Sequence, residues 1–159
     1  MTTAGRFAPS PTGPLHLGSL VAAVGSWLYA RAAGGRWLVR MEDLDRPRVI
    51  EGADREILAA LQRYGLEWDG AVVYQSQRIA LYEDALTKLR AGGCVFDCGC
   101  SRAELQRAAS APAASDPTER ERIYAGTCRN GLPEGRSARA VRFRAAGVVR
   151  FEDMIFGPV

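Results

Sequence analysis

The chain has a single histidine, no long apolar run and only a small excess of positive charge. Each of these shortages limits the classes of protein to which the chain can belong. No apolar stretch approaches the roughly 18 residues that cross a bilayer, and the start MTTAGRFAPS lacks the apolar core of a signal peptide. We therefore predict a cytoplasmic protein. The net charge of +3 permits a nucleic-acid partner but does not argue for one, because a basic patch has to be shown locally.

Cysteines are also few, four in 159 residues, and two of them form the tripeptide CGC. In a reducing cytoplasm such cysteines indicate a metal site or reactive thiols before disulfides. The rest of the composition, 47% hydrophobic and 25% charged, is typical of a globular domain with a real core. We find no internal repeats.

Strand and helix signals alternate in the first part of the chain. Apolar positions at helical spacing, each series stopped by glycine, predict helices within residues 17–33, 52–65 and 78–93. Short apolar runs predict strands at RFA (6–8), RWLVRM (36–41) and VVYQ (72–75). This alternation predicts an α/β fold with a parallel, doubly wound sheet, in which ligands bind beyond the carboxyl ends of the strands.

The pattern changes at Cys94. CVFDCGCSRAEL predicts a strand, a tight cysteine knuckle and a helix start, with Ser101 and Glu104 spaced as a capping box. The following segment, rich in Ala, Ser and Pro, predicts a mobile loop over residues 108–118. Alternation in residues 137–157 predicts a hairpin that turns at Gly147.

The segment RFAPSPTGPLHLGSL, residues 6–20, holds the only histidine, His16, in a turn. Three prolines stiffen the turn and two glycines let the backbone approach a ligand: Pro9, Pro11, Pro14, Gly13 and Gly18. A helix beginning near Leu17 would point its free N–H groups at an anion such as phosphate. His16 could then donate hydrogen bonds to charge that develops in phosphoryl or nucleotidyl transfer. A proline-rich turn with one structural histidine is the alternative, and the residues alone leave both open.

PSPTGPLHLGS resembles the HIGH-type signature of the class I aminoacyl-tRNA synthetases, and RFAPSPTG resembles the glutamate-branch form of its lead-in. The resemblance implies catalytic roles for His16, Gly18 and Ser19. It implies that Thr12, His16 and Gly18 bind ATP, with Mg²⁺ accompanying the nucleotide. It further implies a set of residues that hold glutamate: Arg6, Phe7, Ala8, Pro9, Ser10 and Glu42. The planar fork of Arg6 suits a carboxylate.

RMEDLDRPR resembles the second landmark of this family, in which Glu42 corresponds to the residue that receives the ammonium group of the amino acid. An acidic side chain suits a cation at that place. Without the turn upstream, the charges from Glu42 to Arg48 would be interpreted as a solvated cluster.

Cys98 and Cys100 in CGC, followed by Tyr124 and Cys128 in YAGTC, resemble the zinc site of the glutamyl-Q tRNA(Asp) synthetases, a branch of this family. There three thiolates and one tyrosine hold the metal, which would be structural because the protein fills all four positions. A tyrosine oxygen is an unusual fourth ligand, and by spacing alone Cys94 competes for its place; we expect Cys94 to be a buried strand residue instead. Cysteines without a metal are the alternative.

The short EWDGAVVYQSQR, together with EDLDRPR and YAGTCR, favours the glutamyl-Q branch over the glutamyl-tRNA synthetases, which carry a longer segment between the WD and QS-R elements. The resemblance implies ATP-dependent activation of glutamate and its transfer to queuosine in the anticodon of tRNA(Asp). A truncated glutamyl-tRNA synthetase and a non-catalytic zinc-bearing RNA- or nucleotide-binding module are the alternatives.

The resemblance covers essentially all 159 residues, but they look like only the first half of the family's catalytic domain. We expect the first half of a Rossmann-like domain over 1–93, a zinc-binding insertion over 94–135 and a β-hairpin region of the insertion over 136–159. The lysine-bearing KMSKS-type loop is absent, so we expect the 159-residue chain alone to lack activity. An exposed sheet edge predicts self-association.

Overall fold

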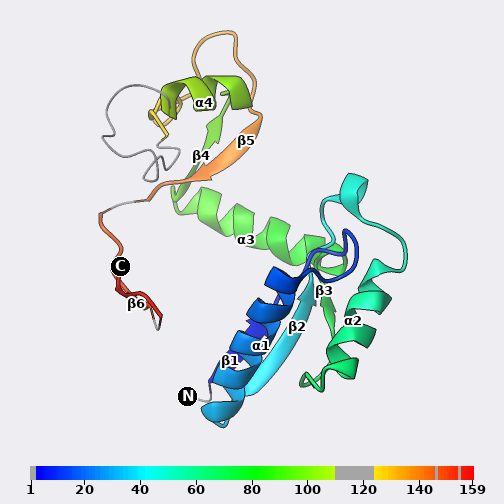
Figure 1. The fold of residues 1–159 in the computed structure, drawn as a ribbon. Helices are drawn as coiled ribbons and strands as arrows, with labels where there is room; N and C mark the ends of the chain where they lie inside the picture. Colours follow the sequence, from blue (N-terminus) through cyan, green and yellow to red (C-terminus); the bar gives the residue numbers. More distant parts are fainter. Residues whose placement is uncertain (1–2, 110–123, 146, 154) are drawn as a thin grey trace. The chain divides into compact units, whose positions relative to one another are not determined.

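The computed structural model describes residues 3–109, 124–145, 147–153 and 155–159 (Figure 1). The chain divides into two compact units, Met1–Glu83 and Asp84–Val159. The boundary lies inside helix α3 (Ile79–Ala91), ten residues before the predicted boundary at residue 93. Among the described residues, no helix combines the length and the apolar character that crossing a membrane requires.

The first unit contains a three-stranded parallel sheet of order β1-β2-β3. Its strands are β1 (Ala4–Phe7), β2 (Arg36–Met41) and β3 (Val73–Tyr74). Phe7 lies opposite Val39, and Met41 lies opposite Tyr74, so the carboxyl ends of all three strands meet at one edge. The predicted parallel sheet is confirmed.

The helices of this unit also follow the prediction. α1 (Leu17–Ala32) joins β1 to β2, and α2 (Ala53–Arg63) lies between β2 and β3, with short 3₁₀ helices at Arg46–Arg48 and Gln75–Arg78. Gly34 and Gly65 follow the two α-helices with φ of 62° and 70°, a conformation that glycine adopts without strain. The predicted glycine stops are therefore confirmed.

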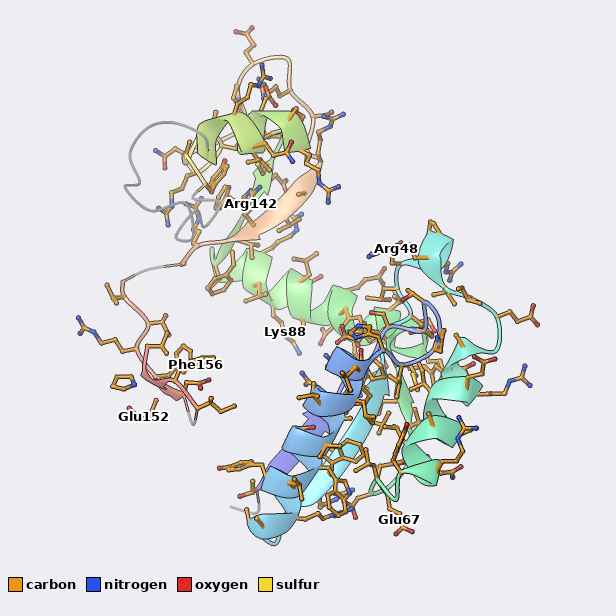
Figure 2. All side chains as sticks on the ribbon, viewed as in Figure 1. Arg48, Glu67, Lys88, Arg142, Glu152 and Phe156 are labelled. Atoms are coloured by element: carbon orange, nitrogen blue, oxygen red, sulfur yellow. The ribbon has the colours of Figure 1, made fainter. Side chains whose placement is uncertain are left out.

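The core of the first unit lies between β2 and these two helices, where side chains fill the space (Figure 2). Trp37, Val39 and Met41 alternate along β2, are buried, and pack in one cluster with Ile57 and Leu61 of α2. α1 adds Ala23 and Ala30 to the same cluster. A doubly wound sheet needs helices on both faces, and that part of the fold stays a prediction.

The second unit contains an antiparallel pair, β4 (Val95–Cys98) and β5 (Ala140–Phe143), in which Cys98 lies opposite Ala140. Helix α4 (Arg102–Ala109) begins after the cysteine knuckle. The Ser101 N–H donates to Glu104 Oε2 at 2.7 Å, and the Glu104 N–H donates to Ser101 Oγ at 3.2 Å. The predicted capping box is confirmed.

The hairpin predicted to turn at Gly147 is wrong. Among the described residues β5 pairs with β4, and a separate antiparallel pair joins β6 (Glu152–Asp153) to β7 (Gly157–Pro158). Alternation along one strand identifies the strand but not its partner, which here lies far back in the sequence. The loop predicted over 108–118 lies outside the described residues except for its first two positions, which end α4.

Candidate functional site

The proline-rich turn follows β1 and is fixed by hydrogen bonds to the segment that follows β2. The Pro9 carbonyl accepts from the Glu42 N–H at 2.9 Å, and the Pro11 carbonyl accepts from the Ile50 N–H at 2.9 Å. Because the two strands are parallel, both segments leave the same edge of the sheet. The turn therefore lies where this class of sheet binds ligands.

His16 is the N-cap of α1, with an extended backbone. The Ser19 N–H donates to His16 Nδ1 at 3.2 Å, and the Ser19 hydroxyl lies 3.0 Å from Nε2. A Cβ at Gly18 would lie 3.1 Å from Cε1 of the imidazole, closer than most real Cβ contacts. Glycine at position 18 thus leaves room for the ring at the exposed start of the helix.

A cavity of about 590 Å³ opens at this turn. Its lining includes every residue predicted to bind ATP or glutamate or to act in catalysis, except Arg6 and Glu42. Ile57 of α2 and Ala22 of α1 supply part of the remaining wall. Gly18 and Ser19 of the first turn of α1 also line it, so the start of the helix borders the cavity.

Arg6 and Glu42 lie apart from this cavity. Arg6 precedes the buried Phe7 on β1, so it points to the other face of the sheet, where it is exposed. Glu42 directly follows β2, and its carboxylate accepts from Arg40 Nη2 at 2.7 Å. The backbone hydrogen bond to Pro9 ties Glu42 to the turn.

Sequence reasoning missed a contact that joins the ends of β2 and β3. The Ser76 N–H donates to Asp43 Oδ1 at 2.9 Å, and the Ser76 hydroxyl donates to Oδ2. Burial raises the pKa of Asp43, but these hydrogen bonds outweigh it and hold the pKa below its usual value. Ser76 follows the short β3 at the same sheet edge, which was the available signal.

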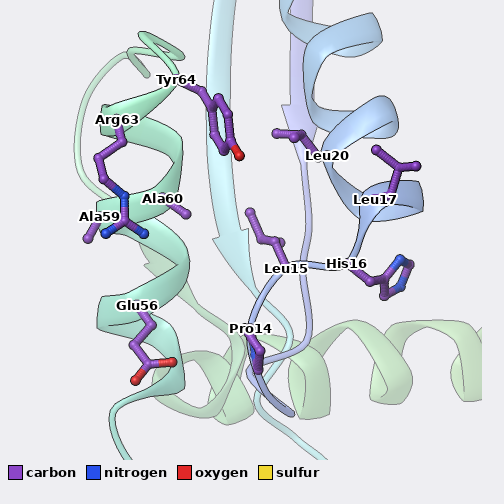
Figure 3. A pocket seen from close by; sticks show the side chains of 10 residues that line it. All are labelled: Pro14, Leu15, His16, Leu17, Leu20, Glu56, Ala59, Ala60, Arg63 and Tyr64. Carbon is purple, nitrogen blue, oxygen red and sulfur yellow. The ribbon is translucent and has the colours of Figure 1, made fainter.

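A second cavity, of about 600 Å³, lies between the start of α1 and α2 (Figure 3). Leu15, Leu20 and Tyr64 point into it, and α2 adds the charged side chains of Glu56 and Arg63. It shares Pro14, Leu15 and His16 with the first cavity, so the histidine borders both.

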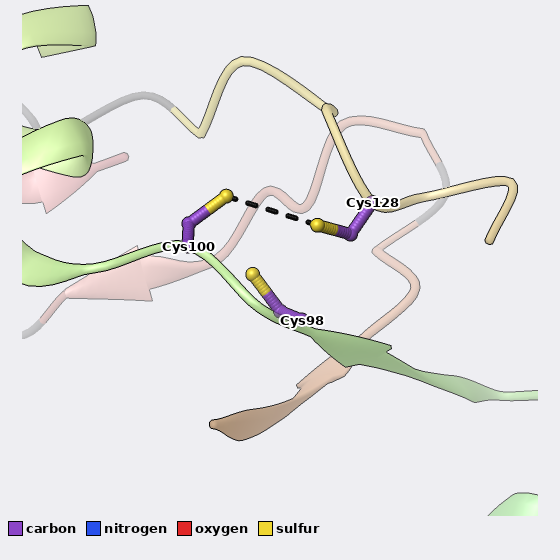
Figure 4. Close-up of side chains that lie close together, drawn as sticks. All are labelled: Cys98, Cys100 and Cys128. Atoms are coloured by element: carbon purple, nitrogen blue, oxygen red, sulfur yellow. Dashed lines mark hydrogen bonds between the residues drawn. The ribbon is translucent and has the colours of Figure 1, made fainter. Parts of the chain in front are cut away.

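Three cysteines of the second unit come together at the end of β4 (Figure 4). The sulfur atoms of Cys98, Cys100 and Cys128 all lie within 4.8 Å of one another, and Cys100 Sγ lies 3.8 Å from Cys128 Sγ. Cys94 does not belong to this group. Its sulfur lies 3.5 Å from the Gly92 carbonyl oxygen, and the residue is only partly buried and precedes β4, so its prediction as a buried strand residue is wrong.

Tyr124 borders the three sulfurs. Its oxygen lies 3.6 Å from Cys98 Sγ and accepts from the Cys128 N–H at 2.7 Å. Around a tetrahedral zinc with Zn–S of about 2.3 Å and Zn–O of about 2.0 Å, neighbouring sulfurs lie about 3.8 Å apart, and sulfur and oxygen about 3.5 Å. The donor types and these two spacings fit such an ion.

An arginine that sequence reasoning did not identify also reaches this cluster. The Arg142 guanidinium carbon lies 4.3 Å from the centre of the Tyr124 ring. Burial raises the pKa of the Cys98 thiol, but hydrogen bonds, first that of Arg142, outweigh burial and lower it to about 6. Burial and the neighbouring sulfurs raise the pKa of Cys100. Alternation in AVRFR, which puts both arginines on one face, was the available signal.

Comparison with known proteins gives consistent matches. The profile of the family described as "tRNA synthetases class I (E and Q), catalytic domain" matches residues 2–157. A protein of Aromatoleum aromaticum named glutamyl-Q tRNA(Asp) synthetase is 57% identical over 154 residues, which are 97% of this chain and 47% of that protein. One of the same name from Thiobacillus denitrificans is 58% identical over 154 residues, 96% of this chain and 49% of that protein.

Solved structures agree on the fold. The glutamate–tRNA synthetase of Elizabethkingia anophelis matches with a TM-score of 0.73 at 27% identity, over 100% of this chain and 36% of that one. A glutamate–tRNA ligase from Elizabethkingia meningosepticum, solved in complex with its amino acid, matches equally well. The chain spans about half the length of the curated relatives it matches.

Proposed function

The chain belongs to the class I tRNA synthetases of the glutamate and glutamine branch, and on that premise we propose that the protein activates glutamate with ATP and transfers it to queuosine in the anticodon of tRNA(Asp). The name shared by relatives that are 51–58% identical over nearly the whole chain is the observation that carries this acceptor. The solved glutamate–tRNA synthetases support glutamate as the amino acid.

The cavity at the turn receives ATP in this proposal. In the first step the glutamate carboxylate attacks the α-phosphorus, an acyl–phosphate bond forms, and the bond to pyrophosphate breaks. Negative charge grows on the phosphate oxygens, and the exposed His16 ring and the first N–H groups of α1 stabilise it. Thr12 and Gly18 line the same cavity and bind the nucleotide, whose Mg²⁺ neutralises further charge.

The lead-in strand and the end of β2 hold the amino acid in this proposal. Residues 7–10 line the cavity, and Glu42, bonded through its backbone to Pro9, receives the ammonium group. Its carboxylate is paired with Arg40, so the ammonium group competes with or joins this ion pair. Arg6 lies outside the cavity and has to bring its side chain around the strand to reach a carboxylate.

Cys98, Cys100, Cys128 and Tyr124 bind one structural zinc in this proposal, because the donors are gathered together and two of their spacings match those of a tetrahedron. Elemental analysis should find one zinc per chain in the wild type. Cys98→Ser should lose the metal, whereas the matched Cys94→Ser should keep it. Loss of zinc in Cys94→Ser would mean that Cys94 replaces Tyr124 as the fourth ligand.

Glutamate-dependent exchange of pyrophosphate into ATP, measured on the full-length protein, tests the first step. His16→Ala should lower the exchange rate about 10²–10³-fold, because it removes a preorganised donor from the site. The exposed α2 change Gln62→Ala is the matched control and should leave the rate unchanged. Absence of exchange in the wild type would favour a non-catalytic binding module.

Transfer of labelled glutamate tests the acceptor. We expect transfer to tRNA(Asp) that contains queuosine and none to the same tRNA without it. Charging of the terminal adenosine of tRNA(Glu), with queuosine-containing tRNA(Asp) untouched, would assign the protein to the glutamyl-tRNA synthetases that its structural neighbours represent.

A further inference from the structure

We propose that Arg142 is a positioning residue of the cysteine cluster: its guanidinium holds the ring of Tyr124 so that the tyrosine oxygen, and not a water molecule, is the fourth ligand of the metal. The proposal rests on the zinc site proposed above. A water in the fourth position would leave the ion open, whereas a fixed tyrosine closes it and makes the site structural.

Three contacts hold Tyr124. Arg142 lies over its ring at 4.3 Å, the Phe96 ring lies 5.9 Å away at an interplanar angle of 32°, and the Cys128 N–H donates to its oxygen. Phe96 and Arg142 are register partners across β4 and β5, so the pairing of these strands brings both to the ring. β4, which carries Cys98, thus also carries the Phe96 ring that lies against Tyr124.

Arg142 is held at this place despite an unsatisfied donor. Its Nε is buried and, within the described part of the chain, has no hydrogen-bond partner. A buried unpaired donor is unfavourable, so other attractions have to hold the guanidinium in place. The ring face of Tyr124 provides one of them, and the hydrogen bond to Cys98 provides another. In the loaded site three thiolates and one Zn²⁺ would add a single negative charge.

The chain offers a matched control two residues further on. The Arg144 guanidinium carbon lies 5.0 Å from the centre of the Phe96 ring. Both arginines thus lie over an aromatic ring of the same unit, but Arg142 also hydrogen-bonds the Cys98 thiol. Phe96 has no atom that can bind a metal, so loss of the Arg144 contact reports packing and general charge alone.

Zinc affinity, measured on the full chain by competition with a chromogenic chelator, should separate the two. Arg142→Gln should weaken zinc binding about 10–100-fold, the usual effect of removing a group that orients a ligand. Arg144→Gln should leave the affinity near that of the wild type. Arg142→Lys should recover only part of the loss, because an ammonium group keeps the charge but not the planar face.

Cobalt(II) shows whether the effect passes through Tyr124. Tyr124→Phe removes the oxygen ligand and should change the visible bands of the Co²⁺-loaded chain. Arg142→Gln should change them in the same way. The double variant should bind metal no more weakly than the weaker single variant, because two changes that act on one ligand are not additive.

The outcomes can be told apart. Wild-type affinity and a wild-type cobalt spectrum in Arg142→Gln overturn the proposal, and so do equal losses in Arg142→Gln and Arg144→Gln. The proposal is also overturned if the double variant loses zinc affinity by the product of the two single losses, because the two changes would then act independently. If Arg142→Gln does not fold, Arg142→Lys carries the same spectral test. A wild-type chain that binds neither Zn²⁺ nor Co²⁺ refutes the metal site itself, which is a different result.

Discussion

The two units of this chain support their candidate sites by different means. In Met1–Glu83 nine buried hydrophobic residues form one cluster, and the turn with His16 is built on the strand that this cluster fixes. Among the described residues of Asp84–Val159, the buried cluster consists of Phe96, Cys98 and Cys128. Two of these three are proposed metal ligands. In the first unit a core holds the site, whereas in the second the site is most of the core.

The apolar residues near the end of the second unit do not enlarge that core. Val148, Ile155 and Phe156 are 80%, 86% and 82% exposed. A small domain without a sufficient core commonly depends on a disulfide or a metal. All four cysteines are free thiols in this structure, so a metal held by three of them is a stabilisation that the described residues of this unit offer.

Removing the proposed zinc should have the largest effect and should act on one unit only. Structural zinc in small domains binds with an apparent free energy of about 10–16 kcal/mol, which becomes folding free energy. A chelator should therefore abolish amide-exchange protection in β4 and β5 and leave it in β2. All three tryptophans lie at 27, 37 and 68, in the first unit, so their emission should not change. A loss of amide-exchange protection in both units would contradict the view that the two units are stabilised independently.

Leu61→Ala should give the complementary result. Leu61 is fully buried in the cluster of the first unit, so its truncation should lower the free energy of unfolding by about 2–5 kcal/mol. Urea unfolding followed by tryptophan emission measures this change. The matched control Leu81→Ala, at a side chain that is 56% exposed, should cost much less. Zinc affinity should be unaffected in both variants, and a loss in Leu61→Ala would show that the core of the first unit also supports the metal site.

The same contrast separates what the sequence predicts from what it does not. The spacing of apolar residues and the glycine stops predict each end of α1, α2 and α3 to within two residues of its place in the structure, because helix signals are local. The partner of β5 was predicted incorrectly, because strand pairing is decided by contacts distant in sequence. The structure of the first unit is thus more predictable from the sequence than that of the second.

The candidate sites show the same limit. The resemblance supplies residue types for the turn and for the metal cluster, and the structure shows that Arg6 and Glu42 lie outside the cavity that the other predicted residues line. Contacts such as Asp43 with Ser76, or Arg142 on Tyr124, join distant segments, and the local signals, a strand end or alternation along a strand, do not identify the partner residue. Only a fold that brings the segments together reveals them.

Ser101→Ala should have a smaller effect, confined to the second unit. It removes the side-chain half of the capping box at α4 and should lower the free energy of unfolding by about 1 kcal/mol. Zinc-loaded protein is compared in urea, with amide protection in α4 as the probe. The tryptophan transition of the first unit should stay where it is in the wild type. Ser101→Thr, which keeps the hydroxyl that bonds Glu104, should restore most of the loss. A Ser101→Ala variant without any loss would mean that Glu104 and Arg136 hold the helix start alone.

Asp69 should give the smallest effect, a change in how the first unit responds to acid. The Asp69 carboxylate accepts hydrogen bonds from the Trp37 N–H at 2.7 Å and from Arg31 Nη1 at 2.7 Å. These two contacts hold the pKa of Asp69 below its ordinary value of 3.8. Because the folded pKa is the lower one, this stabilisation is fully present above pH 3.8 and is lost as the pH falls through the folded pKa. Asp69→Asn should therefore flatten the acid dependence of the tryptophan transition.

Acid also tests whether the two units respond separately. Protons compete with zinc for thiolates, so lowering the pH should release the metal and unfold the second unit while the carboxylates of the first unit are still ionised. Metal release and the loss of tryptophan emission should then occur at different pH values. In Asp69→Asn only the second event should change, because Asp69 bonds to Trp37 and Arg31, which both belong to the first unit. If metal release and the loss of tryptophan emission occurred at the same pH in the wild type, the first unit would need the second unit to stay folded.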